Sequence, residues 1–208
     1  MGQIFTIHAT HPQARFINQA VDILKQQGVI VFPTESGYSI GCLLDNKRGF
    51  DKICQIRQID NKHNFTLMCR DLTELSTLAK VDNIAFRRIK NNTPGSYTFI
   101  LNATKEVPRR LMNDKRKTVG LRIPGNPIAL ALLAELNMPL MSVTLILPGN
   151  EHAEFDPQAI DDKIGHQVDA IIDGGYIAQQ PTTVIDLTED TPVIIRRGSG
   201  DTAPFEID

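Results

Sequence analysis

The chain has 208 residues, 41% of them hydrophobic and 22% charged, which is ordinary for a globular protein that buries a sizeable core. Because 22 Lys and Arg oppose 24 Asp and Glu, the net charge of −2 gives no overall indication of a nucleic-acid partner. No stretch resembles a signal peptide or a membrane span, so we expect a cytoplasmic protein without a membrane partner.

Helical and strand patterns alternate along most of the chain, and turn or capping residues separate them. The predicted elements, in chain order, are a helix bounded by Pro12 and Gly28, a strand over 29–33, a helix over 50–59, a strand over 64–69, helices over 72–79 and 83–91, strands over 97–101 and 118–124, a helix opened by Pro127, a strand over 138–147, a short helix opened by Asp156-Pro157, a strand over 168–173 and a hairpin of strands 182–187 and 192–197. This order predicts one α/β domain over residues 1–208, with an open twisted sheet of mixed strand direction flanked by helices.

Cysteine and histidine give no sign of a metal site. Cys42, Cys54 and Cys69 are odd in number and lack metal-type spacing, so we expect reduced, mostly buried thiols. The five histidines show no helical pair spacing suited to a metal. We therefore expect no protein-bound zinc.

Polar side chains recur at the ends of predicted strands. The strand 29–33 stops at "PTESGY", which carries hydroxyls and a carboxylate that a plain turn does not need. The remaining members of this set are Ser96, Tyr97 and Thr98, then Arg122, then Ser142 and Thr144, then Thr182 and Thr183, and finally Arg196 and Arg197. Hydroxyls and guanidinium groups can hold phosphates and a carboxylate without a nucleophilic side chain. Each residue alone also has a structural explanation, because threonine favours strands and arginine stems cover surfaces.

Taken together, these stretches resemble the YrdC-like family, and within it the YciO branch. The resemblance rests on "VIVFPTESGYSIGC", "TPGSYTFIL", "VGLRIP", "MPLMSVT", "PTTVIDL" and "IIRRGSG", which keep the family's motif order over nearly the whole chain. It implies a twisted α/β sheet with a concave, basic face.

The resemblance also implies an activity. The best-known members are L-threonylcarbamoyl-adenylate synthases, which combine L-threonine, bicarbonate and ATP with Mg²⁺ and release pyrophosphate. Their product serves the threonylcarbamoyl modification of adenosine in tRNA. By resemblance, this chain is a weak or divergent nucleotidyltransferase of that type, and the expected partners are ATP, L-threonine and bicarbonate.

The resemblance assigns roles to individual residues. Thr34 and Tyr38 match a loop that lines the substrate cavity, and Thr98 matches a threonine that contacts substrate. Arg122 matches an arginine near the threonine carboxylate. The matches near the nucleotide are Ser142, Thr182 and Arg197.

Three departures accompany these matches. The synthases carry Lys-x-Arg where this chain has Arg57-Gln58-Ile59, so one cation is changed and one is lost. They carry Ser-x-Asn where Thr144 stands at the amide position, and a histidine of some synthases falls at Arg70. Losing one charge-assisted phosphate contact costs about 1.5–3 kcal/mol, or roughly one to two orders of magnitude in binding or rate.

The alternative is a non-catalytic protein that binds tRNA or double-stranded RNA. From Lys105 to Arg122 seven basic residues stand against two acidic ones. The candidate RNA-binding residues are Lys105, Arg109, Arg110, Lys115, Arg116 and Lys117. Such a segment is either an anion-binding patch or a solvated surface, and its sequence alone leaves both open.

Overall fold

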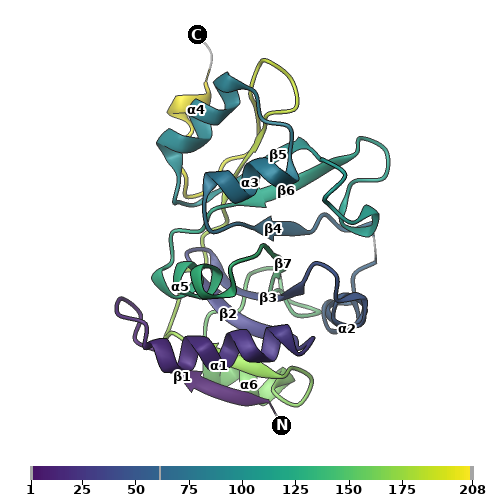
Figure 1. Ribbon diagram of the computed structural model, residues 1–208. Helices are drawn as coiled ribbons and strands as arrows, with labels where there is room; N and C mark the ends of the chain where they lie inside the picture. The colour runs from purple at the N-terminus through teal and green to yellow at the C-terminus, as the bar shows by residue number, and fades with distance from the viewer. Residues whose placement is uncertain (1, 61, 207–208) are drawn as a thin grey trace.

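The computed structural model describes residues 2–60 and 62–206, and within them the strands form a single mixed sheet (Figure 1). The strands are β1 Gln3–Thr6, β2 Ile30–Thr34, β3 Gly37–Leu43, β4 Thr66–Met68, β5 Tyr97–Asn102, β6 Thr118–Arg122, β7 Leu140–Thr144, β8 Ala170–Asp173, β9 Thr183–Asp186 and β10 Val193–Arg196. Their order across the sheet is β1-β8-β2-β3-β7-β4-β6-β5-β9-β10. The predicted α/β fold with mixed strand direction is therefore confirmed.

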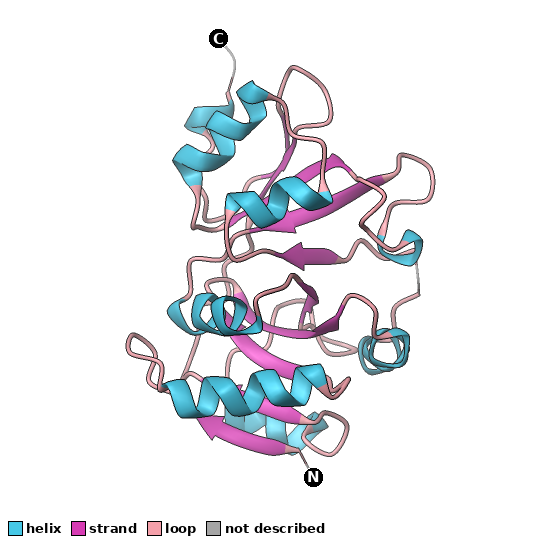
Figure 2. Ribbon diagram, in the orientation of Figure 1, coloured by secondary structure: helices cyan, strands magenta, loops and turns pink. Residues whose placement is uncertain are grey.

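The helices surround the sheet, as Figure 2 shows. They are α1 Ala14–Lys25, α2 Lys47–Arg57, α3 Leu72–Leu78, α4 Asn83–Asn92, α5 Pro127–Leu136 and α6 Pro157–Ile164, with short 3₁₀ turns at Arg109–Leu111 and Ala203–Phe205. None of the helices in the described ranges is long and apolar enough to cross a membrane.

Residues on opposite faces of the sheet belong to two different hydrophobic clusters. Along β2, Val31 belongs to the cluster that includes residues of α2, α3, α4 and α6, whereas Ile30 and Phe32 belong to the cluster that includes residues of α1 and α5. This alternation follows from the two-residue period of a strand. The cluster with α1 and α5 covers mainly the part of its face near β1, β8 and β2. The same face of the remaining strands carries polar side chains as well as apolar ones.

The pairing of strands places these polar residues on one face. Ser142 on β7 pairs with Gly41 on one side and with Thr66 on the other, and Thr66 pairs with Gly120. Directly paired residues share a face, so Ser142, Thr66 and Arg122 project on the side that β2 presents to α1 and α5. We call this side of the strands β3, β7, β4, β6, β5, β9 and β10 the polar face.

The sequence prediction needs three corrections at element level. The strand β1 was not predicted, because its four residues carry only one buried side chain and give little pattern. The strand β3 was not among the predicted elements, although Tyr38 to Leu43 is buried throughout. The strand β7 ends at Thr144 rather than continuing to residue 147.

Candidate functional site

The turn between β2 and β3 is built around the buried side chain of Thr34. Its Oγ1 donates to the carbonyl of Gly37 at 2.7 Å and accepts from the amide of Ser36 at 3.1 Å. Gly37 has φ of +101°, and a side chain there would meet Ala153 Cβ at 2.5 Å, so glycine is required. The hydroxyl of Thr34 thus shapes the turn, and the turn presents Glu35.

Tyr38 lies on the opposite face from the polar residues. Its hydroxyl donates to the carbonyl of Gly175 at 2.7 Å and accepts from the amide of Gly174 at 3.1 Å. Burial raises the pKa of Tyr38 far above its usual range, so the phenol stays neutral. Thr34 is therefore oriented toward the polar face, whereas Tyr38 belongs to the core beneath the sheet.

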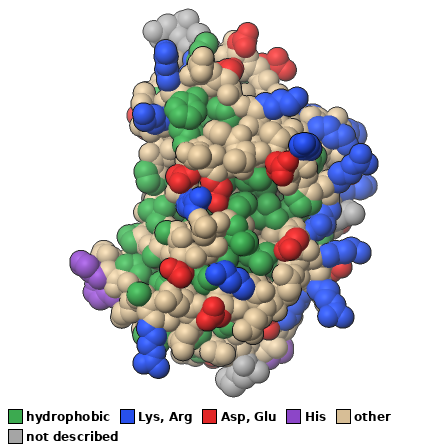
Figure 3. Space-filling model, viewed as in Figure 1, with side chains coloured by type: hydrophobic (Ala, Val, Ile, Leu, Met, Phe, Trp, Pro, Cys, Tyr) green, Lys and Arg blue, Asp and Glu red, His purple; other side chains and the backbone are tan. Residues whose placement is uncertain are grey.

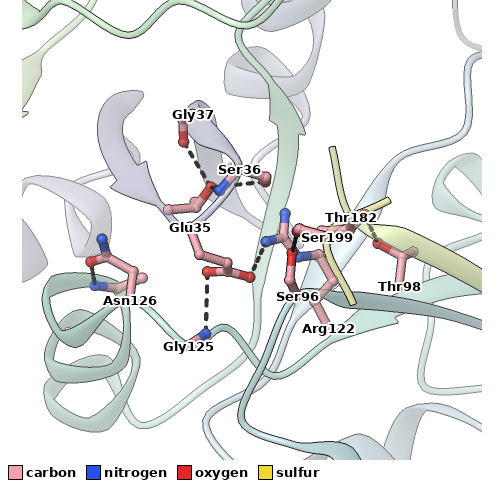
Figure 4. A network of polar contacts seen from close by, with 12 residues as sticks. Glu35, Ser36, Gly37, Ser96, Thr98, Arg122, Gly125, Asn126, Thr182 and Ser199 are labelled. Carbon is pink, nitrogen blue, oxygen red and sulfur yellow. Dashed lines mark hydrogen bonds and ion pairs between the residues drawn. The ribbon is translucent and has the colours of Figure 1, made fainter. Parts of the chain in front are cut away.

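Arg122 and Glu35 form the central ion pair of the polar face (Figure 4). Arg122 Nη2 donates to Glu35 Oε1 at 2.6 Å, and the amide of Gly125 donates to Glu35 Oε2 at 3.2 Å. The arginine is 4% exposed, and its Nε has no hydrogen-bond partner among the described residues. A buried guanidinium with a free donor is a site that an oxyanion can complete.

Hydroxyl groups from distant segments meet beside Arg122, as Figure 4 shows. Thr98 Oγ1 and Thr182 Oγ1 lie 2.9 Å apart, and the hydroxyls of Ser96 and Ser199 are also hydrogen-bonded. The parallel pairing of β5 with β9 brings these segments together. Hydroxyls donate or accept as needed, so the cluster can bind a phosphate or carboxylate oxygen.

Arg196 is the second guanidinium of this cluster. It donates to the carbonyl of Thr182 from Nε at 3.0 Å and from Nη2 at 2.9 Å, and Nη2 also lies 3.1 Å from Thr182 Oγ1. Burial, and then the neighbouring charge of Arg122, lower the pKa of Arg196. Two cations therefore lie within electrostatic reach of each other.

Arg197 is placed elsewhere, although the sequence assigned it to the nucleotide. Its Nη1 donates to Glu206 Oε1 at 2.7 Å and to Thr202 Oγ1 at 2.5 Å, and its side chain is 65% exposed. Its neighbour Arg196 projects to the polar face instead. Arg196, and not Arg197, is therefore the arginine that contacts Thr182.

The side chain of Arg57, the last residue of α2, contacts the segment that follows β7, the strand of Ser142 and Thr144. Its Nε donates to the carbonyl of Ile146, two residues beyond β7, at 2.6 Å. Its Nη1 is buried without a partner in the described structure, and burial lowers its pKa. Ser142 is buried and makes only a long contact of 3.5 Å to the carbonyl of Thr66. Arg57 therefore places one buried cation beside the segment that follows β7.

The basic segment between β5 and β6 divides into two groups. Arg110 donates to the carbonyl of Leu44 and lies over the Phe50 ring, and Arg116 contacts Asp186 Oδ2 at 2.9 Å. Both arginines therefore have partners within the protein. Lys105, Arg109, Lys115 and Lys117 are exposed, and Arg116 is also exposed in spite of its contact with Asp186. In Figure 3 Lys and Arg side chains gather along the right-hand edge of the molecule, where Figure 1 has this loop and α2.

Sequence reasoning did not nominate several members of the cluster. Glu35 and Arg196 stood among the polar residues at strand ends but received no role, and Ser199 and the amide of Gly125 were not singled out. The "RRG" stretch could have suggested Arg196, but adjacent arginines on a strand cannot be told apart without the register. Among the described residues, no group of three or more His, Cys, Asp or Glu side chains could hold a metal ion.

The fold and the cluster define an α/β protein with a candidate oxyanion site on one sheet face. A family profile for Sua5, YciO and YrdC, described as "Telomere recombination", matches residues 22–198. The chain therefore belongs to this family, as the sequence motifs indicated.

Similar proteins place the chain within the family. YciO of Escherichia coli K12 is 60% identical over 205 residues, which are 99% of this chain and all of that protein, and its crystal structure superposes with a TM-score of 0.94. A threonylcarbamoyl-AMP synthase of Vibrio vulnificus is 27% identical over 161 residues, covering 76% of this chain and 86% of the enzyme. The crystal structure of P. abyssi Sua5 complexed with L-threonine is 25% identical, with a TM-score of 0.86 over 94% of this chain and 57% of that one.

Proposed function

We propose that this protein binds MgATP at the polar face and is a divergent threonylcarbamoyl-adenylate synthase that serves tRNA modification. The observation that carries the proposal is the convergence of Arg122 and Arg196 with the hydroxyls of Thr98 and Thr182. The similarity to a threonylcarbamoyl-AMP synthase and to the L-threonine complex of Sua5 supports it. Mg²⁺ enters as part of the nucleotide substrate.

The proposed reaction has two steps. The amine of L-threonine combines with bicarbonate to give a carbamate and water. A carbamate oxygen then attacks the α-phosphorus of ATP, the bond between the α- and β-phosphates breaks, and pyrophosphate leaves. Charge develops on phosphate oxygens, so positioning and cationic stabilisation are the protein's main contributions.

In this scheme each residue of the cluster has a role. Arg122 holds the carboxylate of L-threonine, Arg196 stabilises charge on the phosphates, and Thr98 and Thr182 orient oxygens between them. Arg57 supplies the remaining cation near Ser142 and Thr144. Because one cation and one amide of the synthase pattern are replaced, we expect turnover lower by roughly one to two orders of magnitude.

The direct test is pyrophosphate release from ATP with Mg²⁺, bicarbonate and L-threonine, with each substrate omitted in turn. Release that needs all three supports the proposal. Arg196→Ala and Arg122→Ala are expected to lower the rate at least tenfold, because each removes a charge-assisted contact. Arg197→Ala is the matched control and keeps the parental rate. Equal rates in all three variants, with folding checked by circular dichroism, would contradict the site.

A second function, binding of double-stranded RNA or tRNA, is favoured by the exposed basic edge. Charge reversal of Arg109, Lys115 and Lys117 to Glu is expected to weaken RNA binding at least tenfold and to reduce its salt dependence, because phosphate contacts release counterions. A gel-shift titration at several salt concentrations measures this. Arg196→Ala serves as the control and leaves this binding unchanged. Binding that is insensitive to both salt and charge reversal would exclude the basic edge.

A further inference from the structure

On the edge of the Arg122 guanidinium group that Nε and Nη2 form, one of the two nitrogens has a hydrogen-bond partner. The Nε and Nη2 hydrogens of arginine point the same way and together fit two oxygens of a carboxylate or phosphate. Here Nη2 donates to Glu35 Oε1, whereas Nε is buried without a partner among the described residues. A bidentate oxyanion would therefore gain one charge-assisted hydrogen bond that Glu35 does not make.

The position of Glu35 allows its carboxylate to leave Arg122 and be replaced there by another anion. It lies in the turn after β2, and its second oxygen accepts from the amide of Gly125, just before α5. Its side chain is 19% exposed, whereas that of Arg122 is 5% exposed. The carboxylate can thus turn toward water when released, while the buried arginine stays in place and requires a negative partner.

The local charge balance favours an incoming anion. Arg122 and Arg196 are close enough for the first to lower the pKa of the second. Glu35 is the one carboxylate that contacts either guanidinium among the described residues. Removing Glu35 from Arg122 without a substitute would leave two neighbouring cations, so exchange requires a ligand that itself carries negative charge.

We propose that Glu35 is a carboxylate latch: it occupies Arg122 in the empty site, and a bidentate oxyanion of the ligand displaces it. The identity of that oxyanion, the carboxylate of L-threonine, rests on the function proposed above. The latch makes Arg122 selective for anionic ligands. A ligand with a single neutral acceptor cannot compensate the arginine for the loss of the Glu35 carboxylate.

The test compares anion binding to the wild type and to Glu35→Gln by isothermal titration and by thermal shift. Glutamine keeps the shape of the side chain but removes the competing charge. We expect the variant to bind L-threonine and inorganic sulfate about tenfold more tightly, and to gain more thermal stability from either. L-Threoninamide, which lacks the carboxylate, is expected to show no such gain. Adding Arg122→Gln to either background abolishes the effect.

The matched control is Glu206→Gln, which breaks an exposed ion pair of similar length, 2.7 Å, away from the cluster. It leaves both affinities unchanged. Unchanged or weaker anion binding in Glu35→Gln, or no binding of either anion to any variant, overturns the latch. If sulfate binding tightens but L-threonine binds neither protein, the latch stands and the proposed substrate fails.

Discussion

Tyr38 shows how a residue matched to a substrate loop can instead hold the fold together. Its ring is fully buried, and its hydroxyl links the start of β3 to the turn after β8 through Gly174 and Gly175. These segments lie far apart in sequence, and both adjoin the end of β2. The tyrosine therefore fixes the edge of the sheet from which Glu35 projects.

Removal of this hydroxyl is expected to destabilise the protein. Tyr38→Phe leaves a carbonyl and an amide without their partner, which costs about 1–3 kcal/mol of unfolding free energy. The pKa of Tyr38 is raised in the folded state, so this contribution is constant below about pH 9 and declines only above about pH 10. Urea denaturation at several pH values measures it. Tyr176→Phe is the control, because Tyr176 is 77% exposed; equal losses in the two variants would contradict the argument.

Adjacent residues limit what can be predicted about the site from sequence. Arg196 and Arg197 have the same chemistry, and the motif alone does not say which one joins the polar cluster. In the structure a register shift lies between Ile194 and Arg196, at the edge of the sheet. Such an irregularity decides which arginine meets Thr182, and no local pattern reveals it.

At the scale of elements, helices were predicted well because their ends carry local chemistry. Asp71 accepts from the amide of Glu74, and Asp82 accepts from the amides of Ile84 and Ala85, as the capping patterns indicated. Strands were less predictable. The edge strand β1 has a single buried residue, and its pairing with β8 depends on a segment more than 160 positions away.

The cap of α4 gives a prediction at this scale. Asp82→Ala removes two hydrogen bonds at the first turn and is expected to lower the unfolding free energy by about 1 kcal/mol. Asp82→Asn should retain nearly full stability, because asparagine caps helices as well as aspartate does. Urea denaturation of both variants measures the difference. If alanine and asparagine were equivalent at this position, the cap would contribute nothing.

At the scale of the whole molecule, the class of fold followed from the alternating elements but the strand order did not. The parallel neighbours β5 and β9 are separated in sequence by β6, β7 and β8. Glu35 and Arg122 are 87 positions apart; Glu35 follows β2, and β2 is not a neighbour of β6, which carries Arg122. Composition and periodicity report local structure, so they did not predict the meeting of these side chains, and the resemblance assigned a role to Arg122 alone.

The late position of β9 and β10 has a consequence for synthesis of the protein. Thr182, Arg196 and Ser199 complete the cluster begun by Thr98 and Arg122, and they are synthesised after those two residues. Domains form from the N-terminal side as the chain emerges from the ribosome. A nascent chain can therefore pair Glu35 with Arg122 before the segment that carries Thr182 and Arg196 has been made. The two guanidinium groups of the cluster therefore come together only after β10 has been synthesised.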